Sequence, residues 1–178
     1  MTFAHDTEVS LQAAVTLVNS AEPPDTLDTV EALDEFYTEF EYSGRRDGDD
    51  AELAAVRALR PVLRELLTSD RDHAVELVNA MLAEAGALPE LVRHDRWDWH
   101  LHAVAPDAPL ATRIVVETAM AMIDVIRADE MSRLAVCADA DCEGVVLDLS
   151  RNRSRKFHST ACGNRNAVAA YRQRQRAD

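Results

Sequence analysis

The sequence predicts a mainly α-helical protein with one short β-hairpin, followed by a small cysteine-containing module at the C-terminus. Apolar residues recur at helical spacing through most of the first 130 residues. Aromatic residues make up only 5% of the chain, which favours helices over a β-sandwich or barrel. All three cysteines lie between residues 137 and 162. We therefore expect an α+β N-terminal domain over residues 1–130 and a separate module over residues 131–178.

Four helices are expected before residue 86, over residues 9–19, 29–40, 50–67 and 70–85. In each, apolar side chains recur every three or four positions and form one buried stripe. Asp28 or Thr29 can cap the second helix, because these side chains accept hydrogen bonds from free helical amides. Pro61 should kink or split the third helix, since proline lacks the amide hydrogen and clashes with the preceding turn.

The pattern then changes to two short strands, at residues 88–94 and 97–104, followed by a long core helix at residues 110–128. In the second strand Trp97, Trp99 and Leu101 alternate with polar residues. We expect this face to pack on the long helix. The histidines of the region are expected to be partly exposed strand residues; they are His94, His100 and His102. A second metal site, or a ligand pocket lined by the tryptophans, is the alternative.

Charge is divided unevenly along the chain. Residues 151–178 hold eight cations and one acid, a net charge of +7, which leaves −20 for residues 1–150 out of the total of −13. Such asymmetry is typical of an acidic body that carries a basic contact surface. The sequence has neither an apolar run long enough to span a membrane nor a secretion signal, so we expect a cytoplasmic protein.

Four candidate metal ligands fall in two close pairs, Cys137 with Cys142 and His158 with Cys162. Zinc prefers four thiolate or imidazole ligands in a tetrahedron, and two close pairs can supply them. An odd number of cysteines without a secretion signal argues against a disulfide framework. A module of this size has too little apolar surface to fold alone, so metal binding would supply folding energy. We predict one structural zinc ion; buried, inert cysteines beside a surface histidine are the alternative.

The local pattern predicts a treble-clef or zinc-ribbon-like zinc finger. The first two cysteines bracket a turn, and residues 145–147 can pair with Lys156 and Phe157 in a hairpin around the basic loop. A helix over residues 161–175 would carry Cys162 in its first turn, where the positive end of the helix dipole favours a thiolate.

Three segments resemble the CGNR zinc-finger family: Arg133-Leu134, residues 147–155 (LDLSRNRSR) and Cys162-Gly163-Asn164-Arg165. Bacterial proteins of this family usually pair the finger with an N-terminal ABATE domain, which is associated with stress-induced transcription regulation. Val18-Asn19 and the succession of helices, strand pair and helix are similar to that domain.

The resemblance implies that Cys137, Cys142 and Cys162 are zinc ligands and that the position of His158 supplies the fourth. The family more often has cysteine at that position, so this sequence departs from the pattern. Histidine is also a zinc ligand, and three cysteines with one histidine form a common structural set.

The basic stretch between the two ligand pairs is the candidate DNA-binding surface. Guanidinium groups suit phosphate contacts and can read guanine edges, and neutral polar side chains add phosphate hydrogen bonds. Together with the resemblance, this predicts DNA contacts from Arg151, Asn152, Arg153, Ser154, Arg155, Lys156, Arg165 and Arg172. The alternative is a solvated basic loop that pairs with the acidic body of the same protein.

These inferences lead to a transcription regulator whose finger contacts DNA and whose N-terminal domain senses a small molecule or a protein. The alternative is a zinc-stabilised protein-interaction module without DNA binding. Enzymatic activity is not expected, because four protein ligands leave zinc no open position for catalysis. The sequence leaves open which signal is sensed and whether the protein forms a homodimer.

Overall fold

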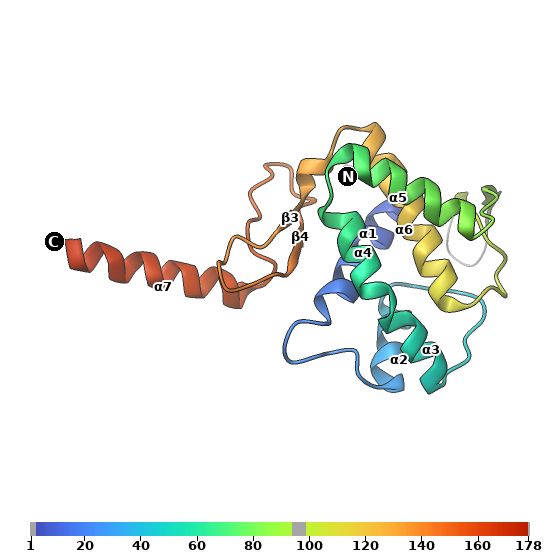
Figure 1. The fold of residues 1–178 in the computed structure, drawn as a ribbon, viewed down its shortest axis with the longest axis horizontal. Coiled ribbons are helices and arrows are strands. Elements are labelled where there is room, and N and C mark those ends of the chain that lie inside the picture. Colours follow the sequence, from blue (N-terminus) through green and yellow to red (C-terminus); the bar gives the residue numbers. More distant parts are fainter. Residues whose placement is uncertain (1–2, 94–98, 178) are drawn as a thin grey trace.

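The computed structural model describes residues 3–93 and 99–177 of the chain and is mainly helical, with two small β-hairpins (Figure 1). We call residues 3–129 the body and residues 130–177 the finger. The elements of the body are α1 (His5–Asn19), α2 (Val30–Glu39), α3 (Asp50–Arg57), α4 (Leu59–Thr68), α5 (Arg71–Glu84), β1 (Glu90–Val92), β2 (His100–His102) and α6 (Leu110–Arg127). The elements of the finger are the 3-10 helix η1 (Met131–Arg133), β3 (Leu134–Val136), β4 (Val145–Leu147) and α7 (Thr160–Ala177).

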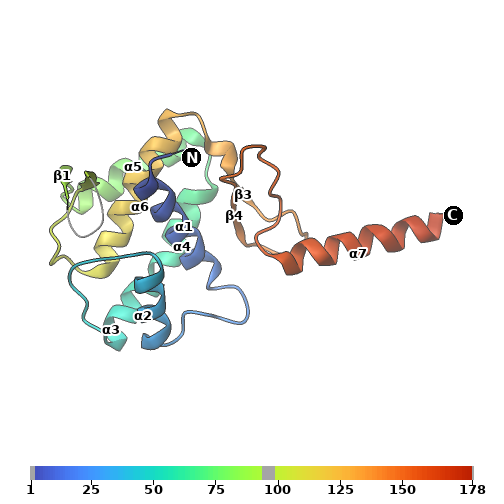
Figure 2. The same cartoon turned by 180° about the vertical axis from the view of Figure 1, so that it is seen from behind.

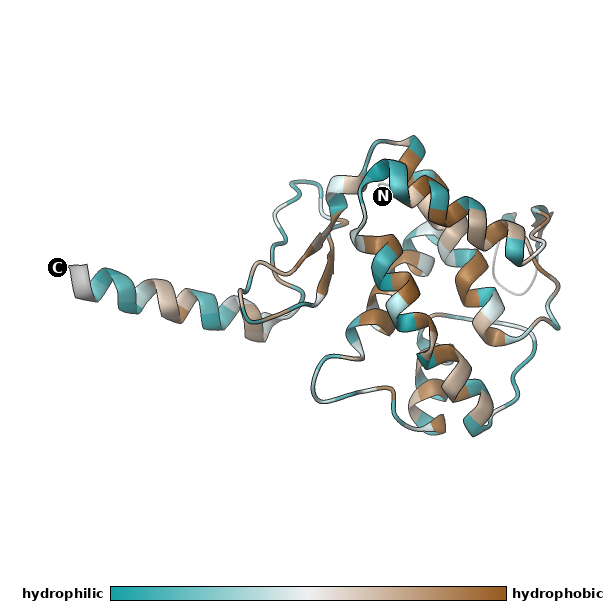
Figure 3. Ribbon diagram, in the orientation of Figure 1, coloured by the Kyte–Doolittle hydropathy of each residue, from teal (hydrophilic) through white to brown (hydrophobic). Residues whose placement is uncertain are grey.

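The core of the body is built around α6, as its apolar composition predicts. Helices α1 and α5 pack against α6, and Leu11, Leu17, Ile114 and Met122 are fully buried between them and their neighbours. Each such side chain contributes roughly 1.5–3 kcal/mol by its removal from water. Figure 3 shows hydrophobic residues gathered where these helices meet, whereas much of α7 is hydrophilic.

The expected helix boundaries in the first half are largely confirmed, and the third expected helix is divided in two. Thr29 caps α2, its side-chain oxygen accepting a hydrogen bond from the amide of Ala32 at 3.1 Å. The division falls at Ala58, between α3 and α4. Pro61 explains this position, because its ring clashes with the carbonyl four residues earlier, that of Arg57.

The first hairpin pairs β1 with β2 in antiparallel fashion, with Leu91 opposite Leu101. The expectation that the aromatic face packs on the long helix is wrong for the described residues, since Trp99 is 63% and Leu101 45% exposed. His100 and His102 are half-buried instead. Alternation shows which residues share a face of a strand but not which face meets the core. His94 and Trp97 lie outside the described residues.

The second hairpin pairs β4 with β3, with Leu134 opposite Leu147 and Val136 opposite Val145. The expected pairing of residues 145–147 with Lys156 and Phe157 is therefore wrong. Leu134 and Leu147 both lie in the core of the body, a burial that the polar loop after β4 could not provide.

The finger lies beside α1 and α4, which β4 and β3 contact, and α7 projects away from the body in both views (Figures 1 and 2). The alternation of β4 divides its side chains between two clusters. Val145 and Leu147 belong to the core of the body, while Val146 packs with the three cysteines. Among the described residues, no helix has both the length and the apolar character that crossing a membrane requires.

Candidate metal centre

The structure brings the four predicted ligands together. One potential ligand atom from each of Cys137, Cys142, His158 and Cys162 lies within 4.8 Å of the others. The Nδ1 atom of His158 is 3.1 Å from the sulfur of Cys142 and 3.5 Å from that of Cys162. Ligand atoms around a tetrahedral zinc ion, with bonds of about 2.0–2.3 Å, are separated by roughly 3.5–3.8 Å. The cluster is therefore close to the size that a zinc ion requires.

Backbone hydrogen bonds shape the turn that carries the first two cysteines. The amide of Cys137, at the end of β3, donates to the carbonyl of Gly144 at 2.8 Å, and the amide of Cys142 donates to the carbonyl of Asp139 at 3.0 Å. The amide of Gly144 donates a hydrogen bond to the sulfur of Cys142 at 3.3 Å. These bonds fix the two sulfurs on one side of the turn, facing the first turn of α7 where Cys162 lies.

Gly144 is a residue of the centre that the sequence analysis did not single out. A Cβ atom added there would lie 2.6 Å from both Cγ and Nδ1 of His158. The imidazole therefore needs a glycine beneath it to reach the three sulfurs. A glycine two residues after a candidate ligand is the signal that could have identified this position.

The thiols are too close together to ionise independently. Burial raises the pKa of Cys137, but hydrogen bonds from the backbone of Asp139 and from His158 outweigh it and lower the pKa to about 7. Burial, reinforced by the neighbouring cysteines, raises the pKa of Cys142 to about 11. A divalent cation removes this conflict because coordination deprotonates a thiol outright. The residues present therefore fit a zinc ion.

Arg165 lies against this centre. Its Nη2 donates to the sulfur of Cys162 at 2.9 Å and its Nε donates to Oδ2 of Asp139 at 2.9 Å. Asp139 is buried, and despite the effect of burial the amide of Asp141 and the guanidinium of Arg165 lower its pKa. Such outer contacts orient metal ligands and balance their charge. Arg165 is one of the predicted DNA contacts, whereas its guanidinium contacts the sulfur of a candidate metal ligand.

Two family models match the chain in agreement with this geometry. The first is ABATE, described as "Putative stress-induced transcription regulator", and it matches residues 11–129, about two thirds of the chain. The chain belongs to the ABATE family. The second is the CGNR zinc finger, which matches residues 133–175 and thus includes all four candidate ligands. A search of curated proteins found no match.

In the CGNR finger, Arg133 and Asp148 anchor the loop that follows β4. The buried guanidinium of Arg133 donates to the carbonyls of Asp148 and Ser150, at 2.8 and 3.1 Å. The carboxylate of Asp148 accepts hydrogen bonds from the amides of Ser150, at 2.8 Å, and Arg155, at 2.6 Å. Arg133 and Asp148 both lie in segments that carry the family resemblance. These hydrogen bonds give the two residues a structural role in the finger.

The candidate DNA-contacting residues fall into separate groups. Arg153 donates to Glu130 at 2.8 Å and to the hydroxyl of Ser132 at 3.1 Å. Arg155 donates to the carbonyls of Leu147, Phe157 and His158. The remaining candidates in the loop and on α7 have exposed side chains; they are Arg151, Asn152, Ser154, Lys156 and Arg172.

In the ABATE domain, His100 and His102 of β2 line a cavity of about 310 Å³. Their Nε2 atoms are 3.0 Å apart, and Tyr42 and Glu117 line the same space. Burial raises the pKa of Glu117 to about 7 and raises that of Tyr42 above its ordinary value. The cavity thus holds a cluster of titratable groups apart from the metal centre.

Proposed function

We propose that this protein is a DNA-binding transcription regulator. One structural zinc ion would hold the CGNR finger together, the exposed cations of the finger would bind DNA, and the ABATE domain would receive the signal. The observation that carries the proposal is the combination of a Cys₃His cluster with α7, a polar helix that leaves the body and bears exposed arginines (Figure 1). The ABATE description supports a role in regulation.

Zinc would have a structural role here. Three cysteines and a histidine fill a tetrahedral shell, so no position stays open for water or a substrate. This supports a regulator rather than an enzyme. Elemental analysis should find about one zinc ion per chain. His158→Ala should lower this content, while His158→Cys should retain it, because cysteine offers the same coordination.

A variant with His100→Ala serves as the matched control, since His100 lies on β2 in the body. Its zinc content should equal that of the wild type. A folded wild-type protein prepared without chelator that contained no metal would contradict the proposed site, and so would zinc loss on His100→Ala alone.

The proposed DNA surface consists of Arg151, Lys156 and Arg172, whose side chains are exposed. A free helix such as α7 is of the size that the major groove admits, and flanking loop cations suit the phosphates on either side. Arg153 is half-exposed but forms an ion pair with Glu130 at 2.8 Å, so we expect it to contribute less to DNA binding. The strongly acidic body would face away from the DNA.

The salt dependence of DNA binding tests this assignment. Three or four phosphate contacts predict a slope of about −3 to −4 in a plot of log affinity against log salt concentration. Arg151→Ala should reduce that slope by about one. Arg127→Ala removes the same charge from an exposed position at the end of α6 and should leave the slope unchanged. Equal effects of the two variants, or no binding by the wild type at low salt, would overturn the proposal.

A second candidate function is a zinc-stabilised protein-interaction module. The observation that favours it is the exposure of Val168 (49%) and Tyr171 (58%) on α7, since apolar side chains on a free helix can also contact a protein. The same titration separates the two functions. Wild-type protein that fails to bind any duplex at low salt would favour this alternative.

A further inference from the structure

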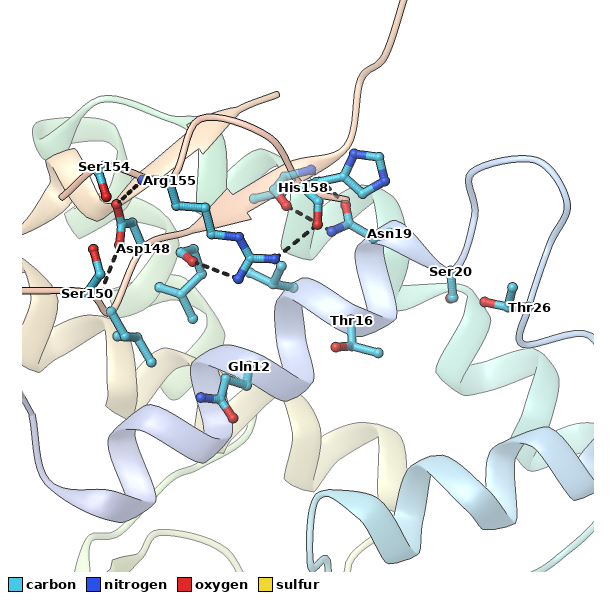
Figure 4. Close-up of a pocket in the computed structure, with 14 residues that line it drawn as sticks. Gln12, Thr16, Asn19, Ser20, Thr26, Asp148, Ser150, Ser154, Arg155 and His158 are labelled. Atoms are coloured by element: carbon cyan, nitrogen blue, oxygen red, sulfur yellow. Dashed lines mark hydrogen bonds between the residues drawn. The ribbon is translucent and has the colours of Figure 1, made fainter. Parts of the chain in front are cut away.

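A polar cleft of about 620 Å³ lies between α1 of the body and the loop of the finger that follows β4 (Figure 4). The body side is formed by α1 and the loop after it, and the finger side by β4 and residues 148–158. Gln12 and Thr16 line the cleft from the body, and Asp148 and Arg155 line it from the finger. The volume lies in the range of small-molecule sites.

Both walls of the cleft are held rigidly. Asn19 bonds to both the amide and the carbonyl of Val145, at 2.6 and 2.8 Å, and so fixes β4 beside the end of α1. The loop after α1 is fixed by Asp25, whose two carboxylate oxygens accept from Arg60 at 2.8 and 2.9 Å. This bond to Arg60 lowers the pKa of Asp25 to about 2. A cleft with fixed walls loses little conformational entropy when a ligand enters.

The floor on α1 offers hydrogen bonds that the protein does not use. Gln12 and Thr16 are four residues apart, so they lie on the same side of the helix. Within residues 3–93 and 99–177, the amide of Gln12 and the hydroxyl of Thr16 have no hydrogen-bond partner, and both side chains are exposed. They present one amide and one hydroxyl to whatever occupies the cleft.

Arg155 supplies the positive charge of the finger wall. Its guanidinium is held over the cleft by carbonyl oxygens, including that of His158 at 3.0 Å, and no carboxylate among the described residues pairs with it (Figure 4). Asp148 also lines the cleft, but its oxygens already accept two backbone amides and its side chain is buried. The exposed charge of the cleft is therefore that of Arg155, while the buried negative charge of Asp148 interacts favourably with the neighbouring cation of Arg133.

We propose that this cleft binds a small hydroxylated anion. A carboxylate or phosphate group would contact Arg155, because a guanidinium held by neutral carbonyls keeps its full charge. The hydroxyl groups of the ligand would bond to Gln12 and Thr16. A ligand in this position contacts the body and the finger at once, so it adds a link between α1 and the basic loop of residues 150–156.

Ligand binding at the cleft does not depend on the proposed function, but its effect on DNA affinity does rest on it. The loop that carries Arg151 and Lys156 also carries Arg155. An anion bound to Arg155 would therefore lower the positive charge beside the proposed DNA contacts. This arrangement would connect a small-molecule signal to the finger.

Isothermal titration calorimetry on the purified full-length, zinc-loaded protein tests the site with three probes. These are gluconate, a hydroxylated carboxylate; glucose 6-phosphate, a hydroxylated phosphate; and glucose, which has no charge. We expect at least one anion to bind with a Kd below about 1 mM and glucose not to bind. The anion that binds identifies the charged group. Binding of neither anion, or equal binding of glucose, would overturn the proposal.

Thr16→Glu places a carboxylate opposite Arg155 at an exposed helical position and should weaken anion binding at least about tenfold. Ala80→Glu makes the same charge change at an exposed position of α5 and should bind as the wild type does. Arg155→Gln should also lose anion binding. The zinc content of this variant is measured as well, to show that the metal centre is intact. Unchanged affinity in Thr16→Glu would overturn the site.

A DNA titration with and without the bound anion then separates this proposal from the proposed function. Anion binding that is lost in Thr16→Glu establishes the cleft even if no DNA is bound. In that outcome the proposed function fails and the cleft remains.

Discussion

The side chain of Asn19 pairs with the backbone of Val145 as a neighbouring strand would. Its Oδ1 accepts from the amide of Val145 at 2.6 Å and its Nδ2 donates to the carbonyl at 2.8 Å, across 126 positions of sequence. A side-chain amide can do this because it carries one acceptor and one donor in the same geometry as a peptide group. The last residue of α1 thereby joins the body to the strand on which the metal centre is built.

Asn19→Ala should lower the free energy of unfolding by about 1–3 kcal/mol. The substitution leaves the amide and the carbonyl of Val145, which lie in a partly buried contact, without protein partners. Chemical denaturation of the zinc-loaded protein measures the loss. Asn79→Ala, at an exposed position of α5, is the control and should change stability by less than about 0.5 kcal/mol. Equal stability of the two variants would show that the pairing does not contribute.

Removal of zinc should release the distal part of the finger and leave the hairpin on the body. Leu134, Val145 and Leu147 lie in the core of the body, whereas Val146 packs with the cysteines. After chelation, hydrogen exchange should remain slow at Val145 and become fast in α7. Most of the helical circular dichroism should persist, and added zinc should restore the rest. A cooperative loss of all helical signal on chelation would contradict a body that folds without metal.

Arg165→Met should speed the release of zinc by roughly tenfold or more, because outer contacts of this kind typically change metal affinity by about 10–100-fold. The change removes the donor 2.9 Å from the sulfur of Cys162 and leaves Asp139 buried without its cation. Transfer of zinc to a coloured chelator follows the rate. Arg172→Met makes the same substitution at an exposed position of α7 and should release zinc at the wild-type rate. If the two variants behave alike, the contact of Arg165 has no effect on the centre.

Glu117 should make the stability of the body fall as the pH rises. Burial raises its pKa from 4.5 to about 7, an effect that Arg113 opposes and Asp6 reinforces. Between these two values the folded protein holds a proton that the unfolded chain has released, so unfolding becomes easier with rising pH. Glu117→Gln stays neutral and should be more stable than the wild type at pH 8, by about 1–3 kcal/mol.

The difference between wild type and Glu117→Gln should shrink toward pH 5, and thermal unfolding across this range measures it. Glu35→Gln, at an exposed position of α2, is the control and should follow the wild type at each pH. A constant difference between Glu117→Gln and the wild type at all pH values would indicate a packing effect rather than titration.

The cluster of candidate metal ligands and the long helices could be predicted from the sequence because their signals are local. Zinc requires thiolates and imidazoles in close pairs, so Cys137, Cys142, His158 and Cys162 stand out by residue type and spacing alone. The apolar period of α6 likewise lies within the helix itself. The family resemblance also rests on short segments, one of which, Cys162-Gly163-Asn164-Arg165, contains a candidate ligand.

The tertiary structure decided what depends on contacts between distant parts of the chain. In the folded protein β4 pairs with β3 rather than with residues 156–157, because the core of the body buries Leu134 and Leu147 together. The tertiary structure also turned Trp99 outward, directed Arg165 to the metal centre and placed Arg155 over a cleft whose floor is α1. The positions of these side chains depend on which elements meet in space, as Asn19 and Val145 do, and no local pattern in the sequence encodes that meeting.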